Sequence, residues 1–222
     1  QQDCQQIDEY VQRNLWPEAK ALEWVAKMDA CGKDIDSKKV LSLVAEQGYL
    51  QVLAILLDRG ADINWHSEGQ GTALMGAVLF KKVDMVAFLL KQGADPNIPN
   101  NVGGTALMMA ASAGNIGISK LLIENGAIIN KHDDYGRTAL INAAEADYTD
   151  VANLLIKNGA DIEAKDAKGN TALMKAAGSG GKETAALLIA KGADIESVNI
   201  FGYTPLIWTA REGHEDVAAL LI

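Results

Sequence analysis

Apolar and polar positions recur along this chain with a fixed period of 33 residues. The apolar triplets of this pattern occupy residues 55–57, 88–90, 121–123, 154–156, 187–189 and 220–222. A threonine follows the same period at Thr72, Thr105, Thr138, Thr171 and Thr204. A glycine follows it at Gly60, Gly93, Gly126, Gly159 and Gly192. A constant period of this length predicts a stack of similar units rather than one globular core.

One unit, residues 138–170, predicts two helices and a projecting hairpin. Its first helix follows the threonine and is rich in alanine, which allows close packing against neighbouring helices. Gly159 ends the second helix, because glycine adopts the left-handed conformation without steric cost. Asp166 and Gly169 then mark a tight turn before the next threonine. The apolar spacing of the second helix predicts a buried stripe of Val151, Leu154, Leu155 and Ile156.

The units share an opening motif and a closing motif. The opening is present as Asp133, Gly136, Thr138 and Leu140, as Asp166, Gly169, Thr171 and Leu173, and as Asn199, Gly202, Thr204, Pro205 and Leu206. The close is Gly-Ala-Asp, which begins at Gly60, Gly93, Gly159 and Gly192 and becomes Gly-Ala-Ile at Gly126. These motifs resemble the ankyrin repeat, whose pattern is an Asp-x-x-Gly-x-Thr-Pro-Leu-His opening, two helices and a Gly-Ala-Asp close. The resemblance implies an all-α repeat solenoid of stacked helix-turn-helix-hairpin units.

The chain departs from the ankyrin pattern inside the repeats and at both ends. Methionine or isoleucine replaces the family's histidine in every opening, and Lys81 and Asp147 replace the glycine between two helices. Terminal repeats of a solenoid are atypical because one of their faces meets water. We therefore expect a modified N-terminal cap over residues 1–38 and one continuous ankyrin solenoid over residues 39–222. The chain stops at Ile222 inside the last second helix, so either the final unit is short or the natural chain continues.

The resemblance also implies where a partner protein would bind. Ankyrin partners dock on the hairpin tips and on the inner face of the first helices. The tip positions in this sequence are Glu68, Val102, Tyr135, Arg137, Phe201 and Tyr203. The first-helix positions are Leu79, Phe80, Glu145, Trp208 and Arg211. Aromatic side chains and arginine contribute most of the binding energy in protein interfaces, which favours these residues as a binding surface. The alternative for Phe201 and Trp208 is that they cover the exposed last repeat.

Charge and hydropathy narrow the classes of partner. The chain has 222 residues and a formal net charge of −9. This charge argues against a nucleic-acid partner, whose phosphates would be repelled. No run of the sequence approaches the roughly 18 consecutive apolar residues of a membrane span.

Both cysteines lie near the N-terminus, at Cys4 and Cys31. Their confinement to one short region predicts a disulfide that fastens the N-terminal tail to the cap, while two unrelated free thiols are the alternative. The chain begins with Gln1 rather than methionine, as a mature chain does after removal of a signal peptide, although a trimmed chain would begin in the same way. Together these features favour an oxidising compartment, which for a bacterial chain is the periplasm.

No arrangement of residues predicts catalysis, a metal site or a cofactor. The three histidines, His66, His132 and His214, have no metal-ligand spacing. Residues 178–184 resemble a phosphate-binding loop, but Ala176 and Glu183 stand where that motif needs glycine and a hydroxyl residue. The sequence therefore predicts a protein that is not an enzyme, needs no cofactor and is a monomer when free.

The sequence favours a periplasmic ankyrin module that binds and inhibits or masks a folded protein, such as a peptidoglycan hydrolase of the cell wall. Exported bacterial ankyrin proteins that protect their own cell, a kind of immunity protein, are similar to it in type. The alternative is a cytosolic scaffold or an effector delivered to a host.

Overall fold

The computed structural model describes residues 17–30, 37–67 and 71–222. The chain forms two compact units, which we call unit 1, up to Asp95, and unit 2, from Pro96. Glu68, Cys4 and Cys31 lie outside the described residues, so the disulfide stays a prediction. None of the helices in the described part of the chain is long and apolar enough to cross a membrane.

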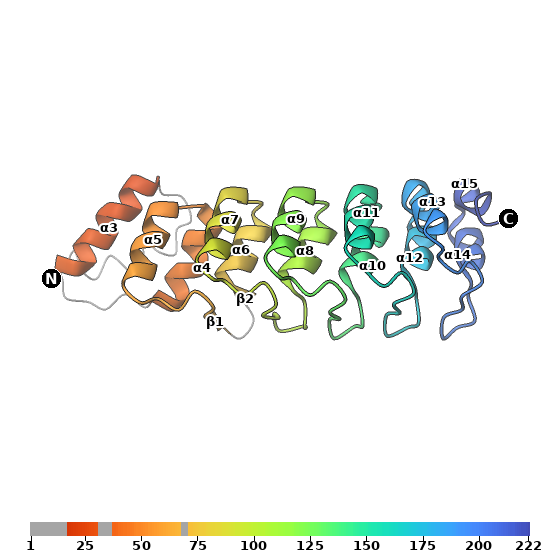
Figure 1. Ribbon diagram of the computed structural model, residues 1–222, viewed down its shortest axis with the longest axis horizontal. Coiled ribbons are helices and arrows are strands. Elements are labelled where there is room, and N and C mark those ends of the chain that lie inside the picture. Colours follow the sequence, from red (N-terminus) through yellow and green to blue (C-terminus); the bar gives the residue numbers. More distant parts are fainter. Residues whose placement is uncertain (1–16, 31–36, 68–70) are drawn as a thin grey trace. The chain divides into compact units, whose positions relative to one another are not determined.

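The described residues of unit 1 form two helix pairs and one further helix (Figure 1). The pairs are α4 (Ser37–Gln47) with α5 (Leu50–Asp58), and α6 (Ala73–Leu79) with α7 (Val83–Lys91). The further helix, α3 (Glu18–Ala30), packs against α5, and α4 packs against α6. The two-residue strands β1 (His66–Ser67) and β2 (Gly71–Thr72) pair within one hairpin and form no core.

Unit 2 repeats the same helix pair along its length (Figure 1). Its pairs are α8 (Ala106–Ser112) with α9 (Ile116–Glu124), α10 (Ala139–Glu145) with α11 (Thr149–Lys157), α12 (Ala172–Ser179) with α13 (Lys182–Ala190), and α14 (Pro205–Glu212) with α15 (Glu215–Ala218). First helices pack against first helices and second helices against second helices. The prediction of an all-α repeat stack is confirmed, while the division at residue 38 stays a prediction.

The repeated threonine begins the first helix of each repeat. Thr72, Thr105, Thr138, Thr171 and Thr204 are extended residues whose side chains accept a hydrogen bond from the backbone N–H three residues later. A side-chain oxygen at this position satisfies one of the amide groups that the first helical turn leaves without a partner. The threonine that recurs every 33 residues is therefore the N-cap residue of five helices.

The core lies between the two rows of helices, and one part of its predicted composition was wrong. In α11, Val151 and Leu155 are buried as predicted, but Leu154 and Ile156 are only half-buried. The third buried residue of this helix is Ala152. The equivalent residues of the preceding repeats, Leu53, Val86 and Ser119, are fully buried too, and the apolar triplet alone did not reveal this position.

The first helix of the last repeat in this sequence is less covered than the others. Met174 and Leu173 in α12 are buried, whereas the equivalent Ile207 and Leu206 in α14 are 43% and 36% exposed. Packing of a following first helix, as α14 packs on α12, is what buries these positions in the earlier repeats.

Lys81 and Asp147, which replace glycine between two helices, adopt the left-handed conformation, with φ of 55° and 57°. Glycines at the equivalent positions of other repeats have the same sign of φ, for example Gly114 and Gly180. The two replacements are not equivalent. The Asp147 Oδ1 accepts a hydrogen bond of 3.4 Å from the backbone N–H of Thr184, in the first turn of α13. Asp147 thus caps a helix of the next repeat, which itself begins at a glycine with no capping side chain.

Replacing each residue with glycine separates strain from capping. Lys81→Gly should stabilise the protein by roughly 0.5–1 kcal/mol, because it removes left-handed strain from a side chain that caps nothing. Asp147→Gly should not raise the free energy of unfolding by more than about 0.5 kcal/mol and should lower it if the cap outweighs the strain. The reason is that this variant loses the cap together with the strain. Urea unfolding measures both. Lys81→Ala is the control, since it removes the side chain but keeps the strain; an equal gain from Lys81→Ala would contradict the explanation.

Candidate functional site

The hairpin tips of unit 2 are held by one side chain in each repeat. The residues in this role are Asn100, Asp133, Asp166 and Asn199. The Oδ1 of each accepts hydrogen bonds from the backbone N–H groups two and four residues later, at 2.8–3.1 Å. Asx residues favour turns through this bond. The turn therefore has the same shape in every repeat and presents residues at equivalent positions to solvent.

Backbone hydrogen bonds then join each tip to the next. The N–H of Asp134 donates to the carbonyl of Val102, that of Ala167 to Tyr135, and that of Ile200 to Lys168, at 2.8–3.0 Å. Because tips and helices both repeat, side chains one period apart form columns along the face of unit 2. The tip column is Val102, Tyr135, Lys168 and Phe201, and the column at the tip base is Gly104, Arg137, Asn170 and Tyr203. The middle of the first helices contributes Met109, Asn142, Lys175 and Trp208, and their last turn contributes Ser112, Glu145, Gly178 and Arg211.

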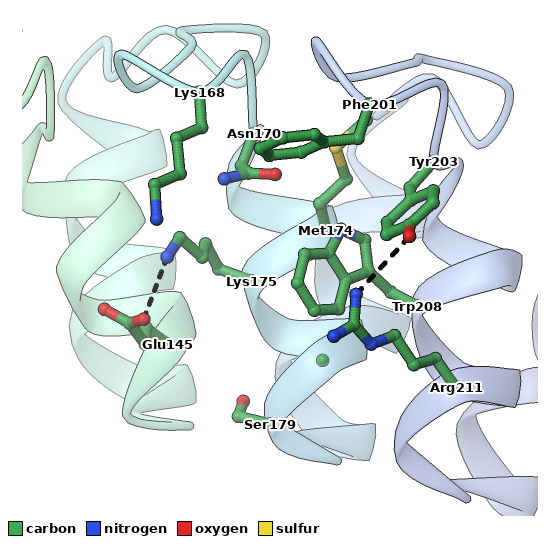
Figure 2. Close-up of a pocket in the computed structure, with 11 residues that line it drawn as sticks. Glu145, Lys168, Asn170, Met174, Lys175, Ser179, Phe201, Tyr203, Trp208 and Arg211 are labelled. Carbon is green, nitrogen blue, oxygen red and sulfur yellow. Dashed lines mark hydrogen bonds and ion pairs between the residues drawn. The ribbon is translucent and has the colours of Figure 1, made fainter.

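The last three repeats enclose a groove on this face, with a volume of about 530 Å³ (Figure 2). Its lining comes from α10, α12 and α14 and from the tips before them. The lining residues are Glu145, Lys168, Asn170, Met174, Lys175, Gly178, Ser179, Phe201, Tyr203, Trp208 and Arg211. This volume lies within the range of ligand-binding clefts, roughly 300–1,000 Å³.

One side of the groove is an aromatic cluster from the last repeat. The rings of Tyr203 and Trp208 meet edge to face with centroids 5.8 Å apart, and Phe201 lies 6.1 Å from Tyr203. The Arg211 guanidinium lies 5.6 Å from the centroids of both Tyr203 and Trp208. Figure 2 shows these four side chains together on α14 and its tip. Such ring and cation–π contacts hold the cluster in place without burying it.

The other side of the groove is charged. The Lys175 Nζ lies 2.9 Å from Glu145 Oε1 and 3.8 Å from the largely buried Asp166 Oδ2. Lys168 projects beside this pair in Figure 2, and within the described residues its ammonium has no ion pair. This side of the groove therefore contains one cation held by carboxylates, Lys175, and another without an ion pair, Lys168.

The Trp208 indole lies over Gly178. A Cβ at this position would lie 3.4 Å from Cε3 of Trp208, which is an ordinary van der Waals contact, so the ring covers the backbone where other repeats carry a longer side chain. The Trp208 Nε1 is buried and has no hydrogen-bond partner in the described part of the chain. Packing and the contact with Arg211, rather than a hydrogen bond, therefore set the orientation of the indole.

A second depression, of about 230 Å³, lies beside Tyr135 and Arg137 and shares Lys168 and Lys175 with the groove. The Arg137 guanidinium lies 5.1 Å from the Tyr135 ring centroid, and its NH2 nitrogen lies 2.8 Å from the buried Asp133 carboxylate. The two depressions are thus parts of one face that extends from residue 135 to residue 211.

The structure brings together most of the predicted partner-binding residues. Glu145, Phe201, Tyr203, Trp208 and Arg211 line the groove, and Tyr135 and Arg137 line the adjoining depression. Val102 is half-buried in the same tip column, but it lines neither depression. Leu79 and Phe80 are exposed, but they belong to unit 1. Whether they share one surface with the residues of unit 2 stays a prediction.

The predicted set omitted the centre of the groove, which includes Lys168, Asn170, Lys175 and Gly178. The available signal was the repeat period, because Lys175 and Gly178 lie one period before Trp208 and Arg211. Among the described residues, no group of three or more potential metal ligands gathers at one point. In unit 1, Glu46 occupies the position in the last turn of α4 that Glu145 occupies in α10. Burial raises the pKa of the Glu46 carboxyl group.

A comparison with protein families agrees with the repeat geometry. The family model described as "Ankyrin repeats (3 copies)" matches residues 18–100, 93–166 and 163–222. The chain belongs to the ankyrin repeat family. Its first matched copy begins at α3, inside the segment that the sequence analysis assigned to a cap. No curated protein matches the chain significantly. Ankyrin repeat proteins are generally interaction modules without enzymatic activity, and the chain is accordingly a protein-binding module.

Asp133 offers a test of how the tip near Tyr135 is held. Asp133→Asn should cost less than about 1 kcal/mol, because it keeps the turn hydrogen bonds that Asn100 and Asn199 make and loses only the partly exposed Arg137 ion pair. Asp133→Ala should cost roughly 1–3 kcal/mol, because two backbone N–H groups lose their acceptor. Urea unfolding of the two variants measures the difference. Equal losses would show that the ion pair, rather than the turn, holds this tip.

Proposed function

We propose that the chain binds a folded protein partner with the face of unit 2 that carries the groove. The observation behind this proposal is the cluster of Phe201, Tyr203, Trp208 and Arg211 on positions that the repeat fold leaves free. Phe201 is 58% exposed, and Tyr135 on the adjoining tip is 56% exposed. Aromatic and arginine side chains held in place on a surface lose little conformational entropy on binding, so they suit the centre of an interface.

The geometry also bears on the alternative that Phe201 and Trp208 merely cover the end of the stack. The Trp208 ring lies over Gly178 of the preceding repeat, and Phe201 and Trp208 both line the groove. The apolar residues left exposed in the last repeat include Leu206, Ile207 and Ile222. Trp208 therefore contributes to the inner face, which favours binding over capping.

In its finer form, the proposal is that the chain is an exported bacterial protein that inhibits or masks its partner in the periplasm. A peptidoglycan hydrolase is the partner that we propose, with the chain as a self-protection protein that is a monomer when free. The periplasmic setting is supported by the confinement of Cys4 and Cys31 to the N-terminal region. The alternative function is a cytosolic scaffold or a host-delivered effector.

Thiol titration of the protein isolated from its native cell separates these settings. We expect no reactive thiol under denaturing conditions, because Cys4 and Cys31 would be joined in an oxidising compartment. Prior reduction is the control and should release both thiols. Two thiols without reduction would favour the cytosolic alternative and leave the binding proposal intact.

Affinity capture with matched variants tests the binding surface. The immobilised full chain is exposed to periplasmic extract, the retained protein is identified, and its affinity is measured for wild type, Trp208→Ala and Lys157→Ala. Trp208→Ala should weaken binding about ten- to hundredfold, because it removes the largest side chain of the cluster. Lys157→Ala, on the second-helix row, should have no effect. The thermal midpoints of both variants should remain close to that of wild type, because both side chains are at least partly exposed.

Addition of the chain to its purified partner tests inhibition. If the partner is a peptidoglycan hydrolase, the chain should reduce the release of soluble fragments from cell-wall sacculi at a one-to-one ratio. Loss of binding in Lys157→Ala with no change in Trp208→Ala would assign the interface to the opposite face. Retained binding without any change in hydrolysis would reject inhibition while leaving the module a binder.

A further inference from the structure

We propose that the groove of unit 2 recognises an acidic peptide segment of the partner, with an Asp or Glu side chain next to an apolar one. This inference rests on the proposed function and specifies the chemistry of the partner at that surface. The carboxylate would lie near Lys168 and Arg211, and the apolar side chain would lie against the rings of Phe201 and Trp208. Three features of the face support this assignment: its local charge, the ion pairs of its cations and the position of its aromatic rings.

The face is positive on a negative protein. The residues that line the groove and the adjoining depression include four cations, Arg137, Lys168, Lys175 and Arg211, and two carboxylates, Glu145 and Asp166. With the Asp133 carboxylate, which pairs with Arg137, four positive and three negative charges leave a local balance of +1, whereas the whole chain carries −9. A local balance opposite in sign to the rest of the surface attracts a small acidic segment and orients it.

The four cations differ in how far they are already neutralised. Asp133 neutralises Arg137, with an N–O distance of 2.8 Å, and Glu145 neutralises Lys175 at 2.9 Å. Arg211 has only a longer contact of 3.5 Å, with the exposed Glu212 beside it. Lys168 has no ion pair within the described residues. The positive charge available to a ligand is therefore concentrated on Lys168 and Arg211.

These two cations are positioned for a ligand that is both charged and apolar. Figure 2 shows Lys168 near the hairpin tips, Arg211 lower on α14, and the rings of Phe201, Tyr203 and Trp208 gathered at the side of Arg211. Arg211 lies over two rings, makes a 3.5 Å contact with the Tyr203 hydroxyl and lines the groove. Its contacts are long, so a carboxylate can bind the guanidinium through charge-assisted hydrogen bonds. An apolar side chain next to the carboxylate can pack on the neighbouring rings.

An acidic peptide fits this face better than a nucleic acid does. A nucleic acid carries a phosphate charge at every nucleotide, so it would extend beyond the local cations over a surface whose total charge is −9. One or two carboxylates on a short segment interact with the local cations within a screening length of about 8 Å.

Selection from a random linear peptide library on the full-length chain tests the inference. We expect the enriched peptides to contain Asp or Glu next to an aromatic or aliphatic residue. The tightest of them, labelled with a fluorophore, serves as the probe in an anisotropy titration. Lys168→Glu should weaken its binding about tenfold in roughly 0.05 M salt and less in roughly 0.5 M salt, because the interaction is electrostatic. Lys157→Glu is the matched control, since it changes the net charge equally on the other helix row.

Several outcomes would overturn the inference. It fails if the selection enriches no peptide, if the enriched peptides are neutral or basic, or if replacement of their carboxylates by amides leaves affinity unchanged. It also fails if Lys168→Glu and Lys157→Glu weaken binding equally, or if an oligothymidine probe binds more tightly than the peptides through the same cations. If partner binding depends on Trp208 but not on Lys168, the acidic segment is rejected while the proposed function stands. If partner binding depends on neither residue, the proposed function is rejected as well.

Discussion

Each repeat of this chain depends on hydrogen bonds and packing that only the neighbouring repeat can provide. The clearest example is the backbone of the hairpin tips, where the N–H of Ala167 donates to the carbonyl of Tyr135 at 2.8 Å. Side chains make equivalent links in the loops after the second helices: the Oδ1 of Asn97 accepts from the N–H of Ile128, and that of Asn130 from Asp161. A buried or half-buried amide without a partner costs about 1–3 kcal/mol, so a repeat that lost its neighbour would lose both this pairing and its apolar cover.

This dependence explains why the face that we propose for binding is a regular array. Because each tip is fixed to the next and each first helix packs on the next, residues one period apart are held at equivalent places on the surface. The fold needs particular residues at the threonine cap, the Asx turn and the buried alanines, but it leaves the outward columns free. The same tip position holds the aliphatic Val102, the aromatic Tyr135 and Phe201 and the cationic Lys168. Under the proposed function, the variation within a column, rather than the repeat itself, would determine which partner the surface fits.

The sequence was sufficient to predict the helix pairs and the glycine that ends each second helix, since both follow from the period and from local chemistry. It did not reveal that Ala152 belongs to the buried stripe in place of Leu154, because which side of a second helix faces its neighbours depends on the angle at which repeats pack. The groove was missed for a related reason. Its centre includes Lys175 and Gly178, which are unremarkable as single residues and become significant only when Trp208 is placed above them.

Gly178 provides the strongest link between the sequence and the groove. Glycine inside a helix is less favourable than alanine by roughly 1 kcal/mol, and its φ is not in the left-handed region that would require glycine. The repeat fold does not require it either, because Ser112, Glu145 and Arg211 occupy the equivalent position in other repeats. A Cβ at this position would make an ordinary van der Waals contact with the Trp208 ring, at 3.4 Å, so an alanine would also fit. Gly178 differs from the longer Glu145 and Arg211 at the equivalent positions in that it leaves the groove beside Trp208 open.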